Sequence, residues 1–237
     1  MMRKNIMETI LITGANRGLG LEAVRQYCVA GWRVIACCRK PEKAEKLQAL
    51  KEHFNQQLVI FQLDVNIKAS QSALSQKLNN QPIDVLLNIA GIWGPKNRKF
   101  GQLETEDWLE TFRTNVVAPL LLSQTLIENI RSGKRKIIAT ISSNMGSVTL
   151  NTEGGEYIYR SSKAALNAAL KSLSIDLKPE KITIIALHPG WVKTDMGGEN
   201  APLNVEESIN GVRNILEHVT FEDSGKFIAH DGQELPW

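Results

Sequence analysis

Short apolar runs rich in β-branched residues alternate with amphipathic stretches along almost the whole chain of 237 residues. The pattern predicts strands over 8–13, 33–38, 58–63, 83–88, 135–142, 181–187 and 225–230. Helices are expected over 18–30, 41–53, 67–80, 104–131, 156–178 and 205–219. Continuous apolar strands belong to a parallel sheet that is covered on both faces. We therefore predict a single α/β domain over 1–237, with a short N-terminal tail over 1–7. Its core would be a doubly wound parallel sheet of about seven strands with helices on both faces.

Composition argues against several classes of function. The longest apolar runs are far shorter than the roughly 20 residues that span a membrane, and no signal-peptide core follows the N-terminal residues. The net charge is +3 and no long run of like charge is present, so we expect no nucleic-acid partner. The four histidines lack the spacing of metal ligands. Cys28, Cys37 and Cys38 form no C-x-x-C motif, which favours free thiols in a reducing, cytoplasmic compartment.

A glycine-rich turn follows the first predicted strand, and reads TGANRGLG from Thr13 to Gly20. Doubly wound sheets bind ligands at the carboxyl ends of their strands, near the point where the strand order reverses. Gly14, Gly18 and Gly20 would permit a tight turn and let backbone N–H groups approach a pyrophosphate. A plain helix entry is the alternative, but the position between a strand and a helix favours dinucleotide binding.

The end of the second predicted strand bears on which dinucleotide binds. NAD-binding folds commonly place an acidic residue about 20 residues past the glycines, where it binds the ribose 2′-hydroxyl. Here the sequence has Cys38, Arg39 and Lys40, with no acid. Arg39, together with Arg17 of the glycine turn, could instead bind a 2′-phosphate; the alternative is that both are solvated surface residues. We predict NADP(H) as the preferred cofactor, with NAD(H) less favoured.

Two further strand ends carry residues suited to a nucleotide. Asp64 and Val65 follow the third strand, where a carboxylate can accept a hydrogen bond from the adenine amino group. Capping of the next helix is an almost equally good interpretation of Asp64. Asn88, Ala90 and Gly91 follow the fourth strand, and small residues there would let the cofactor pass close to the backbone.

Two tyrosines and a lysine lie near the start of the predicted helix over 156–178. Tyr159 and Lys163 are four residues apart and share one helix face, whereas Tyr157 and Lys163 do not. A tyrosine has an ordinary pKa of about 10, and an ammonium beside it lowers that pKa toward the range useful for acid–base catalysis. The same spacing is common in ordinary exposed helix pairs. The serines that end the fifth strand, Ser142 and Ser143, favour a catalytic interpretation because they bring a hydroxyl to the same edge of the sheet.

In their order along the chain, these motifs resemble the short-chain dehydrogenase/reductase family, whose domain has a Rossmann-type fold. The resemblance covers nearly the whole chain and rests on TGANRGLG, LDV, NIAG, TNVVAP, ISS, YRSSK and HPGWVKTD. Each motif is weak alone, but the ordered set is specific. YRSSKAALN, APLNVEES and DGQELPW are most similar to the branch of sniffer-type carbonyl reductases and bacterial C-factor proteins.

The resemblance implies a role for each residue of the site. Tyr159 would give a proton to a carbonyl oxygen as hydride arrives from the nicotinamide, and Ser143, rather than Ser142, would hold that oxygen. Lys163 would bind the nicotinamide ribose and keep the pKa of Tyr159 low, while Asn115 would hold a water that relays protons from Lys163. Further cofactor contacts would come from Asn16, Leu19, Pro189, Gly190, Val192 and Thr194.

The activity expected from the resemblance is NADPH-dependent reduction of a small carbonyl compound to its alcohol, or the reverse. A C-factor-like signalling or sensor protein that binds NAD(P) with little turnover is the alternative. Family members commonly pair two long helices across a two-fold axis, so 104–131 and 156–178 predict a homodimer or homotetramer. The segment between Ser143 and Tyr159 is longer than usual and should border the substrate. Candidate apolar walls of the pocket are Trp93, Met145, Leu150, Trp191 and Met196.

Overall fold

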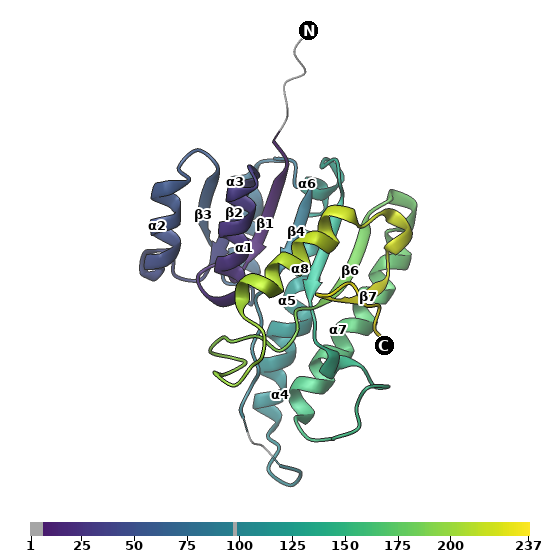
Figure 1. Cartoon of the computed structure of the whole chain (residues 1–237). Coiled ribbons are helices and arrows are strands. Elements are labelled where there is room, and N and C mark those ends of the chain that lie inside the picture. The colour runs from purple at the N-terminus through teal and green to yellow at the C-terminus, as the bar shows by residue number, and fades with distance from the viewer. Residues whose placement is uncertain (1–6, 97–98) are drawn as a thin grey trace.

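The computed structural model describes residues 7–96 and 99–237, so most of the expected tail over 1–7 lies outside the described residues. Within them, seven parallel strands form one sheet in the order β3-β2-β1-β4-β5-β6-β7. The strands are β1 (Thr9–Thr13), β2 (Arg33–Cys38), β3 (Leu58–Gln62), β4 (Val85–Asn88), β5 (Ile137–Ile141), β6 (Thr183–His188) and β7 (Lys226–Ala229). The predicted doubly wound sheet and its seven strands are confirmed (Figure 1).

Helices cover both faces of the sheet (Figure 1). One face carries α1 (Gly18–Val29), α2 (Glu45–His53) and α8 (Val205–His218). The other carries α3 (Lys68–Leu78), α5 (Ala118–Thr125), α6 (Ile127–Arg131) and α7 (Tyr157–Asp176). α8 starts at a capping box: Asn204 Oδ1 accepts from the Glu207 N–H at 2.8 Å, and Glu207 Oε2 accepts from the Asn204 N–H at 3.3 Å.

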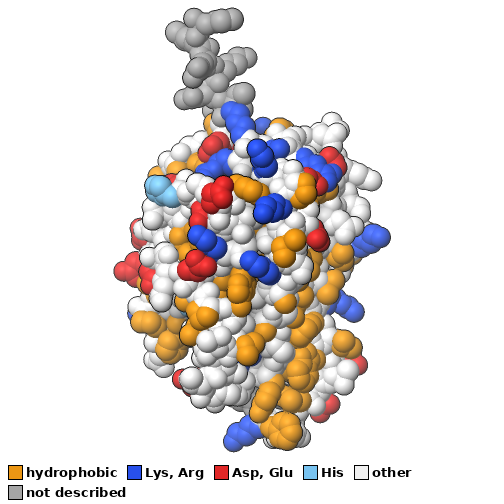
Figure 2. Space-filling model, turned by 90° about the vertical axis from the view of Figure 1, so that its right-hand side faces the viewer, with side chains coloured by type: hydrophobic (Ala, Val, Ile, Leu, Met, Phe, Trp, Pro, Cys, Tyr) orange, Lys and Arg blue, Asp and Glu red, His pale blue; other side chains and the backbone are white. Residues whose placement is uncertain are grey.

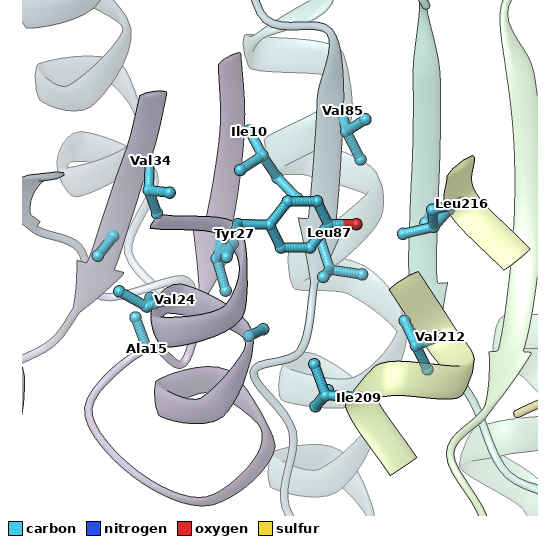
Figure 3. Close-up of a cluster of buried hydrophobic side chains, with 14 of the residues drawn as sticks. Ile10, Ala15, Val24, Tyr27, Val34, Val85, Leu87, Ile209, Val212 and Leu216 are labelled. Carbon is cyan, nitrogen blue, oxygen red and sulfur yellow. The ribbon is translucent and has the colours of Figure 1, made fainter. Parts of the chain in front are cut away.

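The strands read as continuous apolar runs because they alternate their side chains between two buried clusters. Ile10 and Ile12 lie in the cluster beneath α1 and α8, while Leu11 between them lies in the cluster beneath α7. Figure 3 shows the first cluster, with Tyr27 of α1 and Val212 of α8 gathered over the central strands. Each such fully buried aliphatic side chain stabilises the fold by about 1.5–3 kcal/mol.

The stretch predicted as helical over 104–131 is helical over almost its whole length, but it is not one regular α-helix. It is divided into α4 (Thr105–Phe112), a π-helical turn over Arg113–Val117, α5 and α6. Pro119, near the start of α5, has no N–H to donate to the carbonyl of Asn115, so the regular α-helical ladder is interrupted there. The predicted helix over 41–53 is also divided, because Pro41–Lys43 forms a 3₁₀ turn before α2. Single π turns within helices occur often at functional sites, and this one carries Asn115.

Candidate active site

The glycine turn after β1 lies against the end of β4, where the strand order reverses. Gly14 has φ +68°, and a β-carbon on it would lie 3.0 Å from the Ala90 nitrogen. Thr13 Oγ1 accepts from the N–H groups of Ile89 at 3.0 Å and Ala90 at 3.1 Å, which joins the two strand ends. Thr13 was not predicted as a site residue, although its place at the end of β1 is a signal that sequence reasoning could have used.

The start of α1 is open toward an anion. Arg17 precedes the helix without a side-chain capping bond, and the first turn contains no acidic residue. Its backbone N–H groups are therefore left for a ligand, and the helix dipole favours negative charge. A β-carbon on Gly18 would lie 3.4 Å from Thr194 Cγ2, so the glycine turn faces the segment after β6. That segment holds four predicted cofactor contacts: Pro189, Gly190, Val192 and Thr194.

The two predicted phosphate-binding arginines are both exposed, but their surroundings differ. Arg17 forms an ion pair with Asp195, a partner that sequence reasoning did not find. Arg39 forms no ion pair with any other described residue, and its carbonyl accepts from Gln62 Nε2 at 3.2 Å. Asn16 is exposed and Leu19 is half-buried within the same turn.

Asp64 does not cap α3. Its Oδ1 accepts from the Asn66 N–H at 2.9 Å, and Ile67 precedes the helix without a side-chain capping bond. The capping interpretation of Asp64 is therefore wrong, because the carboxylate closes a turn within its own loop. Val65 beside it is half-buried. At the end of β4, the buried Asn88 donates from Nδ2 to Thr140 Oγ1 at 3.5 Å.

The structure brings Tyr159 and Ser143 together at the carboxyl end of β5. Tyr159 is 7% exposed, and its phenol lies near enough to Ser143 for that hydroxyl to act on its pKa. Ser142 points elsewhere and donates to Asn167 Oδ1 at 2.6 Å. Tyr157 is 38% exposed and lies near Phe100, with ring centroids 6.1 Å apart. Tyr159 and Ser143 thus lie together at the strand end while Tyr157 and Ser142 lie elsewhere, and their catalytic roles stay a prediction.

Lys163 is buried beside this pair. Its Nζ donates to the Ile141 carbonyl at 2.9 Å and lies 5.7 Å from the centre of the Tyr159 ring. Burial lowers the pKa of Lys163 to about 8. Burial also raises the pKa of Tyr159 to about 12, and the neighbouring Ser143 hydroxyl acts in the opposite direction. The predicted lowering of the Tyr159 pKa by Lys163 is not found, because the ammonium lies over the ring and desolvation dominates.

Asn115 ties the π turn to the loop after β4. Its Oδ1 accepts from the Ile92 N–H at 2.9 Å, and its Nδ2 donates to the Ile92 carbonyl at 2.8 Å and to Ser162 Oγ at 3.0 Å. A β-carbon on Gly91 would lie 3.3 Å from Asn115 Oδ1 and 3.8 Å from Lys163 Nζ. Gly91, Asn115 and Lys163 are thus neighbours, and the Asn115 amide clamps the backbone beside them.

Trp93 and Glu156 form a contact that the sequence did not reveal. The Trp93 indole stacks on the Tyr159 ring with centroids 4.2 Å apart, and its Nε1 donates to Glu156 Oε2 at 2.9 Å. Trp93 was a candidate wall, but Glu156 was not considered, although it directly precedes the helix that carries Tyr159. The other candidate walls are more open: Leu150, Trp191 and Met196 are exposed, and Met145 is half-buried.

None of the helices over 7–96 and 99–237 is long and apolar enough to cross a membrane. Over the same ranges, no group of three or more His, Cys, Asp or Glu side chains is placed to hold a metal ion.

The chain is similar in sequence to known proteins. Residues 8–204 match the family model described as short chain dehydrogenase. C-signal of Myxococcus xanthus is 42% identical over 156 residues, which cover 66% of this chain and 93% of that protein. An uncharacterized oxidoreductase, C663.06c of Schizosaccharomyces pombe, is 30% identical over 249 residues, which cover 95% of this chain and 96% of that protein.

Solved structures share the whole fold. Carbonyl reductase Sniffer of D. melanogaster has a TM-score of 0.92 and 36% identity, over 98% of this chain and 100% of that one. The NADPH-bound carbonyl reductase from chicken fatty liver has a TM-score of 0.90 and 34% identity, over 98% of this chain and 99% of that one. With a family match over most of its length and a site that gathers the predicted tyrosine, lysine, serine and asparagine, the chain belongs to the short-chain dehydrogenase/reductase family of oxidoreductases.

Proposed function

We propose that the protein is an NADPH-dependent reductase of small aldehydes and ketones. The observation that carries the proposal is the buried group of Ser143, Tyr159 and Lys163 beside Asn115, next to a glycine turn that opens toward an anion. Hydroxyl groups at this place can bind a carbonyl oxygen and supply it with a proton. The similarity to carbonyl reductases of solved structure supports the same substrate class.

The residues present fit a nicotinamide dinucleotide. A β-carbon on Gly20 would lie 2.2 Å from the Gly14 carbonyl oxygen, so the turn tolerates no side chain there and keeps the start of α1 close to the strand end. The N–H groups of that turn would hold the pyrophosphate, and Asp64 and Val65 would border the adenine. The nicotinamide supplies a hydride to the carbonyl carbon when the reduced cofactor is bound.

Tyr159 is the proton donor in this proposal. Burial raises its pKa to about 12, so the phenol carries its proton throughout the neutral range and can give it to the carbonyl oxygen. Ser143 would hold the same oxygen by a hydrogen bond and so align it with the phenol. Lys163 would bind the ribose hydroxyls, and its ammonium would help to return a proton to the phenolate that forms. Asn115 bonds to the Ile92 backbone and to Ser162 rather than to the lysine, and its relay of protons through a water is part of the proposal.

The choice of NADP(H) over NAD(H) is supported by the residues after β2 and by the relatives. Arg39 has no acidic partner among the described residues, and no acid takes the place that a 2′-hydroxyl would need. The chicken reductase of similar fold was solved with NADPH, and a carbonyl reductase of Pseudomonas aeruginosa, at 33% identity and TM-score 0.86, was solved with NADP.

The test measures loss of nicotinamide absorbance with NADPH and then NADH against a panel of aldehydes, quinones and diketones. We expect Tyr159→Phe to bind NADPH but to lose at least about 100-fold in turnover, since general acid catalysis of this kind contributes about 10²–10⁴. Tyr157→Phe is the matched control, because it removes the same hydroxyl two residues away and should keep full activity. Turnover that survives in Tyr159→Phe would contradict the mechanism.

We further propose a homodimer or homotetramer in the cytoplasm. Large hydrophobic side chains are exposed on the helices that would pair, among them Leu109 of α4, Leu121 of α5 and Ile175 of α7. Figure 2 shows a face where charged side chains gather in the upper half and hydrophobic ones form a band in the lower half. A monomeric mass by light scattering at working concentration would contradict the assembly.

The proposed cytoplasmic location is supported by the cysteines. All three are buried and free, which suits a reducing compartment.

A signalling or sensor protein that binds NAD(P) with little turnover is the second candidate, and the similarity to C-signal favours it. The buried Tyr159 and Lys163 support the enzyme instead, because a sensor needs neither group for binding alone. The same panel separates the two: tight NADPH binding without consumption on any carbonyl would support the sensor.

A further inference from the structure

The aromatic face of Tyr159 is covered by a side chain of the protein itself. The Trp93 indole lies nearly parallel to the phenol ring, with ring centroids 4.2 Å apart and 15° between the planes. Its N–H donates to Glu156 Oε2 at 2.9 Å. A flat ring that stacks on one partner and donates from its edge to a second makes the contacts of a bound aromatic ligand.

Glu156 adopts a strained backbone conformation at this place. It has φ +44° and ψ +40°, in the left-handed region, and Gly154 and Gly155 before it also have positive φ. Residues other than glycine persist in this region where the surroundings hold them there, often at ligand-binding sites. Although Glu156 directly precedes α7, its side chain forms no capping bond with that helix. Its carboxylate instead accepts the hydrogen bond from the indole that stacks on Tyr159.

Little room is left between the indole and the wall of the site. The hollow that remains is about 10 Å³, which is space for about one water molecule. Besides the three residues above, it is bordered by Pro95, Leu103, Tyr157 and Ile158. An aromatic compound that stacks on this face of Tyr159 must therefore take the place of the indole.

The backbone on both sides of Trp93 is held in place. Asn115 binds the N–H and the carbonyl of Ile92 at 2.9 and 2.8 Å. Gly94 has φ +82° and lies so close to Thr111 that a β-carbon would be 2.7 Å from Oγ1. The indole must therefore leave by rotation of its side chain, and the carboxylate of Glu156 then needs a new donor.

We propose that this position selects the substrate: a flat aromatic carbonyl compound with an N–H or O–H donor at its ring edge replaces the indole and donates to Glu156. The inference rests on the proposed reductase function and specifies its substrate class. A donor on a carboxylate makes a charge-assisted hydrogen bond, whereas a ring without a donor covers the half-buried Glu156 carboxylate and leaves it unpaired. The reacting carbonyl belongs at the other edge of the ring, toward the hydroxyls of Tyr159 and Ser143.

The test compares two probes that differ in one donor. Isatin is a flat indole dione with a ring N–H, and N-methylisatin is the same dione without it. Calorimetry measures the affinity of each for wild-type protein saturated with NADP⁺, which has no hydride to transfer, so that binding is read without turnover. We expect isatin to bind about tenfold more tightly, because the methylated ring leaves the half-buried Glu156 carboxylate without its donor.

Substitutions test whether Glu156 is the acceptor that makes the protein prefer isatin to N-methylisatin. Glu156→Gly suits the left-handed backbone and removes the acceptor, so the preference should disappear. Glu156→Gln keeps an acceptor oxygen and should retain part of it. Trp93→Phe keeps a stacking ring without the competing N–H, so isatin should bind roughly two- to fivefold more tightly. Glu153→Gln removes an acid from the same loop, with a side chain that is 86% exposed, and should leave the ratio unchanged.

The outcomes separate this inference from the proposed function. Equal affinity of the wild-type protein for the two probes would overturn the substrate class while leaving a reductase of other carbonyls intact. A preference for isatin that survives in Glu156→Gly would overturn it too, because another group would then be the acceptor. Failure of the proposed function looks different: NADPH would not be consumed with any carbonyl, whatever the binding ratio.

Discussion

The buried ammonium of Lys163 should leave a signature in the pH dependence of stability. The ordinary pKa of lysine is 10.5, and burial lowers that of Lys163 to about 8. Below pH 8 both the folded and the unfolded chain hold the proton. Between about pH 8 and 10.5 the folded state has lost it while the unfolded chain still binds it, so the free energy of unfolding rises with pH.

The size of the effect follows from the shift. One pKa unit corresponds to about 1.36 kcal/mol, so the shift from 10.5 to about 8 amounts to about 3 kcal/mol in full. Of this, about 2 kcal/mol should be gained between pH 7 and pH 9.5. Lys163→Met removes the titrating group and also the hydrogen bond to the Ile141 carbonyl, which costs about 1–3 kcal/mol at every pH. The slope with pH, rather than the offset, therefore reports the buried charge.

The assay is urea unfolding of cofactor-free wild-type protein and of Lys163→Met at several values between pH 7 and 9.5. We expect the stability of the wild type relative to the variant to increase by about 2 kcal/mol across this range. Lys171→Met, at an exposed position two turns further along α7, is the control and should give a constant difference. A constant difference for Lys163→Met as well would refute the reasoning that the ammonium is desolvated in the folded state.

Three further substitutions test the clamp and the cofactor site. Asn115→Ala leaves the N–H and carbonyl of Ile92 unpaired, so urea titration should show a loss of about 1–3 kcal/mol in the free energy of unfolding; an unchanged value would contradict the clamp. Arg39→Ala should raise the dissociation constant of NADPH about tenfold in a fluorescence titration, while NADH binding stays constant. Equal weakening of both cofactors would rule out a contact with the 2′-phosphate. Asp195→Asn frees Arg17 from an exposed ion pair and should improve NADPH affinity by at most about fivefold, whereas weaker binding would mean that Asp195 itself supports the site.

The sequence predicted the sheet well because burial on both faces leaves a strong local pattern. Ile10, Leu11 and Ile12 are all apolar since each packs against helices on one side or the other, and this reads directly as a continuous run. The division of the helical stretch over 104–131 could not be predicted in this way. The amphipathic pattern of this stretch gives no sign of the π turn over Arg113–Val117, in which Asn115 accepts a hydrogen bond from Ile92.

The sequence by itself determined the succession of strands and helices along the chain, because apolar periodicity records it. It also determined the glycine turn, from its residues, and the shared helix face of Tyr159 and Lys163, from their four-residue spacing. Only the tertiary structure decided that Ser142 bonds to Asn167, that Arg17 pairs with Asp195, and that Trp93 reaches Glu156 across 63 positions of sequence. It also decided the pKa of Tyr159. A neighbouring ammonium and burial act on that pKa in opposite directions, and their balance depends on how much water the folded chain excludes, which no local pattern records.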